Sequence, residues 1–199
     1  MVTLVVGIGC SGTSCVAGVA HKLGVPMHLP GHSNVHPMTG AGLYEDECFY
    51  GLFAQQPTPS RIERAKKLIA QHERDVWGLK NTKLGAALPW FLPLVGEARV
   101  IAVHRTLVAC AMGRAEGKCA IPFGKTYAWG DACEWAVNAK SAMLAGVSRA
   151  AERGVAVHHV SFEHLIARPE REVVRIADFL VLDATDEALA HVRPELKHN

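Results

Sequence analysis

The chain has 199 residues, 49% of them hydrophobic and 20% charged, which predicts a globular protein with a sizeable core and excludes a disordered chain. Its 21 basic and 19 acidic residues give a formal net charge of +2, so nothing in the bulk charge favours nucleic acid, and any anion site must be local. No run reaches the roughly 20 apolar residues of a membrane-spanning helix, and we expect no membrane partner.

The first elements expected along the chain are a strand, a Gly-rich loop and a helix. Val2–Val6 is a continuous β-branched and Leu run ended by Gly7, which is typical of a strand buried on both faces of a parallel sheet. Apolar residues at helical spacing then predict a helix over residues 12–23, and Gly24 stands where such a helix stops.

Residues 25–60 are expected to form a lid or an acceptor-side insertion. Pro26, Pro30 and Pro37 exclude regular structure from most of residues 25–42, so a long loop is predicted there. Loops of this length in compact domains are usually functional or disordered. Two helical stretches are expected after it, near residues 43–55 and 59–72.

Short strands alternate with helices in the rest of the chain. Strands are predicted over residues 75–80, 99–104 and 155–160. Helices are predicted between the first two strands, interrupted by prolines, and over residues 126–153 and 169–180. This alternation predicts an α/β fold, a single P-loop domain over residues 1–199 with a mostly parallel β-sheet of about four to five strands and helices on both faces.

The loop between the first strand and the first helix carries the strongest chemical signal. Gly7 and Gly12 have the G-x-x-x-x-G spacing of a phosphate-binding loop, in the strand-to-helix context that the motif requires. The glycines allow a tight turn that points backbone N–H groups inward, and the helix N-terminus favours an anion. The predicted anion-binding residues are Gly9, Cys10, Ser11, Gly12, Thr13 and Ser14.

Two features separate this loop from that of nucleotide-hydrolysing proteins. Thr13 stands where those proteins have the Lys for the β- and γ-phosphates, and no later strand ends in the Asp that would hold magnesium. Gly7, Gly9 and Gly12 also satisfy the dinucleotide-binding fingerprint, but no acidic residue ends a second strand about 20 residues further on. The alternative is a strand-to-helix turn that binds nothing; we favour anion binding.

Several short motifs occur in order along the chain. Residues 10–14 read C-S-G-T-S, residues 42–49 read G-L-Y-E-D-E-C-F, and residues 77–81 read W-G-L-K-N. They resemble the segments R-S-G-T-S, G-Y-F-E-D-x-x-F and W-G-W-K-D of the P-loop sulfotransferase superfamily, in particular its bacterial sulfotransferase-like branch. Residues 98–105 are similar to the family's strand that delivers an Arg to the 3′-phosphate of the donor, and residues 162–169 resemble its closing Y-E-D-L-x-x-x-P segment.

The resemblance implies 3′-phosphoadenosine 5′-phosphosulfate as donor, a hydroxyl or amine acceptor, and no metal. Lys80 would approach the transferring sulfuryl group, and Arg105 would grip the 3′-phosphate. Glu45 is our candidate for the general base, because a carboxylate opposite a cationic cleft can take a hydroxyl proton. The alternative is that Glu45, Asp46 and Glu47 form a solvated helix start.

The chain also departs from the family's pattern at two donor contacts. Cys10 replaces an Arg or Lys, and Gly113 stands where a Ser usually helps to hold the 3′-phosphate. Basic residues that could compensate are Arg114, Lys118, Lys125 and Lys197. Three functions therefore stay open: a sulfotransferase, which we favour; a nucleotide kinase or other P-loop phosphotransferase; and a non-catalytic binding protein on the same fold.

Histidines outside the loop give weaker signals. His28, His32 and His36 have four-residue spacing, but the intervening Pro30 denies them a common helical face, so solvent-facing loop histidines are predicted in place of a metal site. His104 is expected to be a hydrogen-bonded residue at the edge of the core, or an alternative base.

The remaining expectations concern partners and compartment. Trp129 and Trp135 are expected in the core or in dimer contacts, which leaves a homodimer as one option. The six cysteines are scattered without a Cys-x-x-Cys pair, which predicts free thiols in the cytoplasm.

Overall fold

A computed structural model describes residues 1–28, 33–35, 42–49, 51–53, 56–72, 75–118 and 125–192. Four parallel strands form its main sheet: β1 (Val2–Val6), β4 (Trp77–Lys80), β5 (Ala98–His104) and β6 (Ala156–Ser161). The strand order is β4-β1-β5-β6. These are the four predicted strands, with ends shifted by no more than two residues, and the predicted α/β fold is confirmed.

The central strand β1 explains why the sheet is covered on both faces. Successive side chains of a strand point to opposite faces, and all five residues of β1 are buried. Leu4 and Val6 join one hydrophobic cluster, whereas Val5 joins the other. A continuous apolar run is therefore required here, because neither face meets water.

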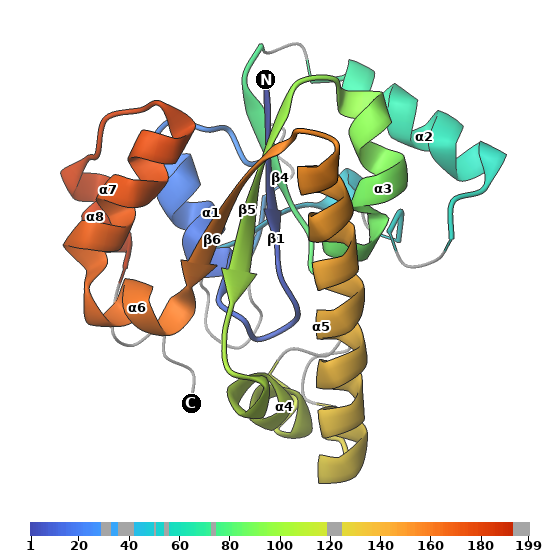
Figure 1. The fold of residues 1–199 in the computed structure, drawn as a ribbon, viewed down its shortest axis with the longest axis vertical. Helices are drawn as coiled ribbons and strands as arrows, with labels where there is room; N and C mark the ends of the chain where they lie inside the picture. Colours follow the sequence, from blue (N-terminus) through green and yellow to red (C-terminus); the bar gives the residue numbers. More distant parts are fainter. Residues whose placement is uncertain are drawn as a thin grey trace.

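Helices form a layer on each side of the sheet (Figure 1). The first cluster includes residues of α2 (Pro59–Ala70), α3 (Leu84–Val95), α4 (Leu107–Ala115) and α5 (Trp129–Glu152). The second includes residues of α1 (Thr13–Lys22), α6 (Phe162–Ala167), α7 (Pro169–Leu180) and α8 (Asp186–His191). The predicted helices over residues 12–23, 59–72, 126–153 and 169–180 correspond to α1, α2, α5 and α7, and the proline-containing segment is α3.

The helix predicted near residues 43–55 is wrong. The structure has strand β3 (Gly42–Asp46) followed by a single 3₁₀ turn, η1 (Glu47–Phe49). Strand β3 pairs antiparallel with β2 (Ser33–Val35), a short strand inside the segment predicted to be irregular. Tyr44 has a φ of 54°, which a right-handed helix cannot include. Tertiary pairing therefore decides this segment, and local pattern does not.

Three short helices were not predicted: α4 with 9 residues, and α6 and α8 with 6 each. Each begins after a Ser or Thr whose hydroxyl accepts a hydrogen bond from a backbone N–H of the first turn: Thr106, Ser161 and Thr185. These N-caps are the sequence signal that could have located the helices.

No helix in the described part of the chain combines the length and the apolar character needed to cross a membrane.

Candidate functional site

The Gly-rich loop leaves the end of β1 and turns sharply into α1. Cys10 and Gly12 have positive φ angles of 60° and 90°. A Cβ on Gly12 would lie 2.2 Å from the Phe162 ring, so the loop can approach the start of α6 only with glycine at this position. Because the first four N–H groups of a helix have no partner within the helix, the start of α1 offers donors to a ligand held by this loop.

Hydroxyl groups lie within and behind the loop. Ser11 and Thr13 are buried. The Ser11 Oγ has no hydrogen-bond partner among the described residues, although a buried hydroxyl normally has one. The loop therefore combines orphan helix donors with an unsatisfied hydroxyl, which suits an anion with several oxygen acceptors.

A buried charged pair stands beside the start of α1. The Lys80 Nζ, at the end of β4, lies 2.7 Å from the Glu45 Oε1 of β3 and donates to the Ser14 Oγ of α1 over 3.2 Å. Lys80 is only 3% exposed. Three residues that are far apart in the sequence thus meet at the carboxyl end of the sheet, next to the loop, where a developing negative charge would be stabilised.

Arg105 approaches the same loop from the end of β5. Its Nη1 donates to the Cys10 carbonyl oxygen over 3.0 Å, and its guanidinium lies 5.2 Å from the centre of the Phe162 ring. The adjacent Thr106 N–H donates to the Glu163 carboxylate over 2.9 Å. Burial raises the pKa of Glu163, but this hydrogen bond, one from its own N–H and the Arg105 charge lower it overall. Arg105 is thereby held against the loop on one side and the start of α6 on the other.

Comparison with known proteins bears on the fold that carries these residues. No protein-family model matches the chain, and no curated protein matches it. Solved structures do. The sulfotransferase domain of the Synechococcus olefin synthase aligns over 100% of this chain and 82% of its own, with a TM-score of 0.60 and 15% identity. The sulfotransferase domain from the curacin biosynthetic pathway aligns over 99% and 79%, with a TM-score of 0.62 and 14% identity. A sulfotransferase from Mycobacterium avium aligns over 99% and 68%, with a TM-score of 0.65 and 15% identity.

The chain has a sulfotransferase-like fold. Within it, five of the predicted site residues form two contacts at the Gly-rich loop and the start of α1. Lys80, Glu45 and Ser14 form one contact, and Arg105 and Cys10 form the other. The alternative interpretation of Glu45, a solvated helix start, is wrong, because Glu45 and Asp46 are buried in a strand.

The two departures from the family's pattern lie against each other in this sulfotransferase-like fold. A Cβ on Gly113 of α4 would lie 2.5 Å from the Cys10 Sγ and 2.9 Å from its Cβ. The Cys10 side chain therefore occupies the space that a larger residue at position 113 would need. Sequence reasoning found both positions but not their contact, because they lie far apart in the sequence.

Phe162 was missed as a site residue. Its ring packs on Gly12 and lies beneath the Arg105 guanidinium, so it positions both the loop and the arginine. An aromatic residue directly after a strand, at the carboxyl end of a parallel sheet, is the signal that could have indicated it.

His104 belongs to a separate hydrogen-bonded group. The Lys140 Nζ lies 2.7 Å from the His104 Nδ1, and the His104 Nε2 lies 2.7 Å from the His159 Nδ1. Burial, followed by the neighbouring Lys140 and His159, lowers the pKa of His104 to about 4. An ammonium donating to Nδ1 places the proton of neutral His104 on Nε2, which suits a hydrogen-bonded histidine at the edge of the core.

The candidate compensating cations contact other groups, or lie outside the described residues. Arg114 lies between the rings of Tyr127 and Trp135, at 4.3 and 4.4 Å from their centres. The Lys118 Nζ lies 2.7 Å from Glu116. Lys125 approaches the Tyr127 ring at 5.2 Å, and Lys197 lies outside the described residues.

The predicted histidine group is only partly described. His28 stacks on His21 at 5.4 Å, whereas His32 and His36 lie outside the described residues. No set of three His, Cys, Asp or Glu side chains within the described residues could hold a metal ion.

Proposed function

We propose that this chain is a sulfotransferase that uses 3′-phosphoadenosine 5′-phosphosulfate and transfers its sulfuryl group to a hydroxyl or amine acceptor. The observation that carries the proposal is the buried Lys80 ammonium, held between Ser14 at the start of α1 and Glu45 on β3. A cation here lies beside the Gly-rich loop, where both the leaving phosphate and the equatorial sulfuryl oxygens would need stabilisation.

The residues of the loop fit such a donor. The orphan N–H groups of α1 and the unsatisfied Ser11 hydroxyl would hold the 5′-phosphosulfate. Arg105, directed at the loop from the neighbouring strand, would hold the 3′-phosphate, since a guanidinium makes paired charge-assisted hydrogen bonds to phosphate oxygens. The bound donor supplies an activated sulfuryl group.

Glu45 would serve the acceptor side. Its carboxylate lies 2.7 Å from the Lys80 ammonium, which supports a place for it beside the transferring sulfuryl group, where the acceptor oxygen or nitrogen would approach. It would take the acceptor's proton as the new bond to sulfur forms and the bond from sulfur to the bridging phosphate oxygen breaks. The departing product would be adenosine 3′,5′-bisphosphate.

The contact between Cys10 and Gly113 favours a second candidate, a non-catalytic nucleotide-binding protein. Cys10 and Gly113 stand at the two positions where the resemblance implies polar contacts to the donor, and the Cys10 thiol fills the space beside Gly113. The kinase interpretation has less support, because Lys80 comes from a neighbouring strand and the loop itself has Thr13 in place of its lysine.

Calorimetric titration with adenosine 3′,5′-bisphosphate, without metal, tests the proposal, beside ATP with magnesium. We expect a dissociation constant in the range of about 1–100 μM for the bisphosphate. Arg105→Ala should weaken binding by roughly 10- to 100-fold, as expected for a charge-assisted hydrogen bond. Lys66→Ala, an exposed cation on α2, is the matched control and should bind as the wild type does.

Three outcomes would contradict the proposal. Binding of ATP with magnesium in preference to the bisphosphate would support the phosphotransferase. Absence of binding by either nucleotide would mean that the cysteine–glycine contact has removed the donor site. Bisphosphate binding with no transfer to any of a broad set of hydroxyl and amine acceptors would select the non-catalytic candidate.

A further inference from the structure

A cluster of aromatic rings lies directly beside the proposed base. The Tyr44 ring of β3 lies 5.5 Å from the His21 ring of α1 and 5.6 Å from the His191 ring of α8, the latter edge-on at 85°. Tyr44 is the residue before Glu45, and none of these three rings belongs to the Lys80 contact or to the Arg105 contact. The cluster therefore joins the strand that carries Glu45 to helices α1 and α8.

The backbone of Tyr44 is unusual for a strand. Its φ of 54° lies in the left-handed region, which side chains other than glycine rarely adopt. Such a conformation persists only where the surrounding contacts hold it. The ring contacts with His21 and His191 are two of the contacts that hold Tyr44. Because Glu45 is the next residue of β3, the backbone conformation of Tyr44 affects the direction of the chain at Glu45.

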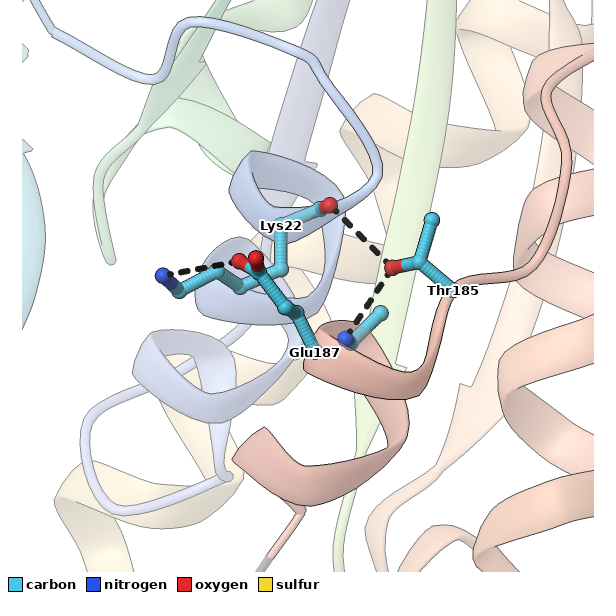
Figure 2. A network of polar contacts seen from close by, with 4 residues as sticks. Lys22, Thr185 and Glu187 are labelled. Atoms are coloured by element: carbon cyan, nitrogen blue, oxygen red, sulfur yellow. Dashed lines mark hydrogen bonds and ion pairs between the residues drawn. The ribbon is translucent and has the colours of Figure 1, made fainter.

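Helix α8 is docked firmly on α1 by contacts at two levels. Near the end of α1, the Lys22 Nζ lies 3.4 Å from Glu187, and the Thr185 hydroxyl donates to the Lys22 carbonyl oxygen over 3.3 Å (Figure 2). One turn earlier, a Cβ on Gly18 would lie 1.9 Å from the His191 Nε2, so the imidazole rests directly on the α1 backbone. The place of the His191 ring is thus fixed by α1.

Helix α1 also contacts the proposed site through residues near both of its ends. Its first turn supplies Ser14, which accepts a hydrogen bond from Lys80, and its last turns supply His21, which contacts Tyr44. Both members of the charged pair are therefore linked to α1. Lys80 is linked through its hydrogen bond to the Ser14 hydroxyl, and Glu45 is linked through the ring of the preceding residue, Tyr44.

We propose that Tyr44 is a positioning residue: its ring, held between His21 and His191, orients β3 so that the Glu45 carboxylate reaches the Lys80 ammonium. Helix α8, the last helix of the described residues, then acts on the site through its contact with Tyr44. The catalytic meaning of this inference rests on the proposed function, whereas its structural content concerns only the buried pair.

Chemical acetylation of lysines, followed by mass spectrometry, measures the pair directly and needs no nucleotide. Lys80 is buried and ion-paired, so it should label slowly in the wild type, and the exposed Lys66 gives a reference rate in the same sample. Glu45→Gln, which removes the pair itself, shows the rate expected when Lys80 is released. The test variants are Tyr44→Ala, which removes the ring, and Tyr44→Phe, which keeps it.

We expect Lys80 to label about tenfold faster in Tyr44→Ala than in the wild type, relative to Lys66, because the pair opens locally. In Tyr44→Phe, Lys80 should be labelled at the wild-type rate. In His191→Ala, the labelling rate of Lys80 should rise toward the rate in Tyr44→Ala. A wild-type rate in folded Tyr44→Ala would overturn the inference. If Tyr44→Ala does not fold, His191→Ala decides in the same way, since it removes one side of the ring contact and leaves β3 intact.

The two proposals fail in different ways. A wild-type chain that does not bind the bisphosphate, but whose Lys80 is released in Tyr44→Ala, would lose the proposed function and keep the positioning role. If the chain binds the bisphosphate but the labelling rate of Lys80 is unchanged in Tyr44→Ala, the proposed function is kept and the positioning role is lost. Once an acceptor is known, Tyr44→Ala should lower kcat and leave the bisphosphate dissociation constant unchanged, and Tyr44→Phe should restore kcat.

Discussion

Cys10 and Gly113 show how a single contact can explain two unusual residues at once. Cys10 adopts a positive φ in the loop. Its thiol lies against the α4 backbone at Gly113, which is the glycine of that helix. Each residue restricts the other: the thiol requires a glycine at 113, and a larger residue at 113 would require a smaller one at 10. The pair is therefore best understood as one feature of the loop.

The pair predicts a stability effect opposite to helix propensity. Alanine is favoured over glycine in a helix by about 1 kcal/mol. We nevertheless expect Gly113→Ala to destabilise the protein by about 1–3 kcal/mol, because its Cβ overlaps the Cys10 thiol. Cys10→Gly should restore stability in the double variant. Urea denaturation measures both, and Gly130→Ala, at an open position of α5, should be neutral or stabilising. Additive effects of the two substitutions would contradict the contact.

At the scale of whole elements, long-range contacts decide the secondary structure of residues 42–49. They also decide the position of α8. Strand β3 is completed by pairing with β2 and by burial of Glu45 and Asp46. The Asp46 Oδ1 accepts a hydrogen bond from the Cys48 N–H, and its Oδ2 lies 3.9 Å from the His72 Nε2 beyond α2. Buried carboxylates of this kind need partners, and only the folded chain provides them.

The docking of α8 on α1 can be tested at Gly18. By propensity alone, Gly18→Ala would stabilise α1 by about 1 kcal/mol. Its Cβ would instead push the His191 ring aside, so we expect a loss of about 1–3 kcal/mol in urea denaturation. Combining it with His191→Ala should recover most of that loss, because the obstruction is removed. If Gly18→Ala raises stability as Gly130→Ala does, the close packing of α8 on α1 is refuted.

For the whole molecule, several half-buried histidines make stability depend on pH. Burial, together with Lys140 and His159, lowers the pKa of His104 from 6.5 to about 4. Burial is also the first cause of the lowered pKa of His21 and of His158, reinforced by His28 and Arg175 respectively. These groups bind a proton more readily in the unfolded chain than in the folded protein.

The sign of the effect follows from these directions. Because the unfolded state binds more protons below pH 6.5, stability is fully present above that pH and is lost as the pH falls toward about 4. The lowered pKa of Glu163 acts in the same direction at the acid end. Urea denaturation from pH 7.5 to 4.5 should show this loss, and His104→Gln should reduce the slope. A slope that is unchanged in His104→Gln would exclude His104 as a source of it.

The sequence by itself determined the features that depend on neighbours along the chain. The buried apolar run of β1, the helical spacing of α1 and the glycine spacing between them predict a strand, an anion-binding loop and a helix, because these patterns are set by local geometry. Alternation of strands and helices then predicts the parallel sheet. Anion binding by the loop, the role of residues 25–60 as a lid and the option of a homodimer remain predictions.

Only the tertiary structure decided the features that join distant segments. Residues 43–55 have the composition of a helix, yet pairing with β2 and burial of Glu45 beside Lys80 make part of them a strand. The contact of Cys10 with Gly113, the place of Phe162 under Arg105, and the ring cluster around Tyr44 each join residues from different elements. No local pattern encodes such contacts, because their energy comes from close packing and from buried charges that find partners only when the whole chain has folded.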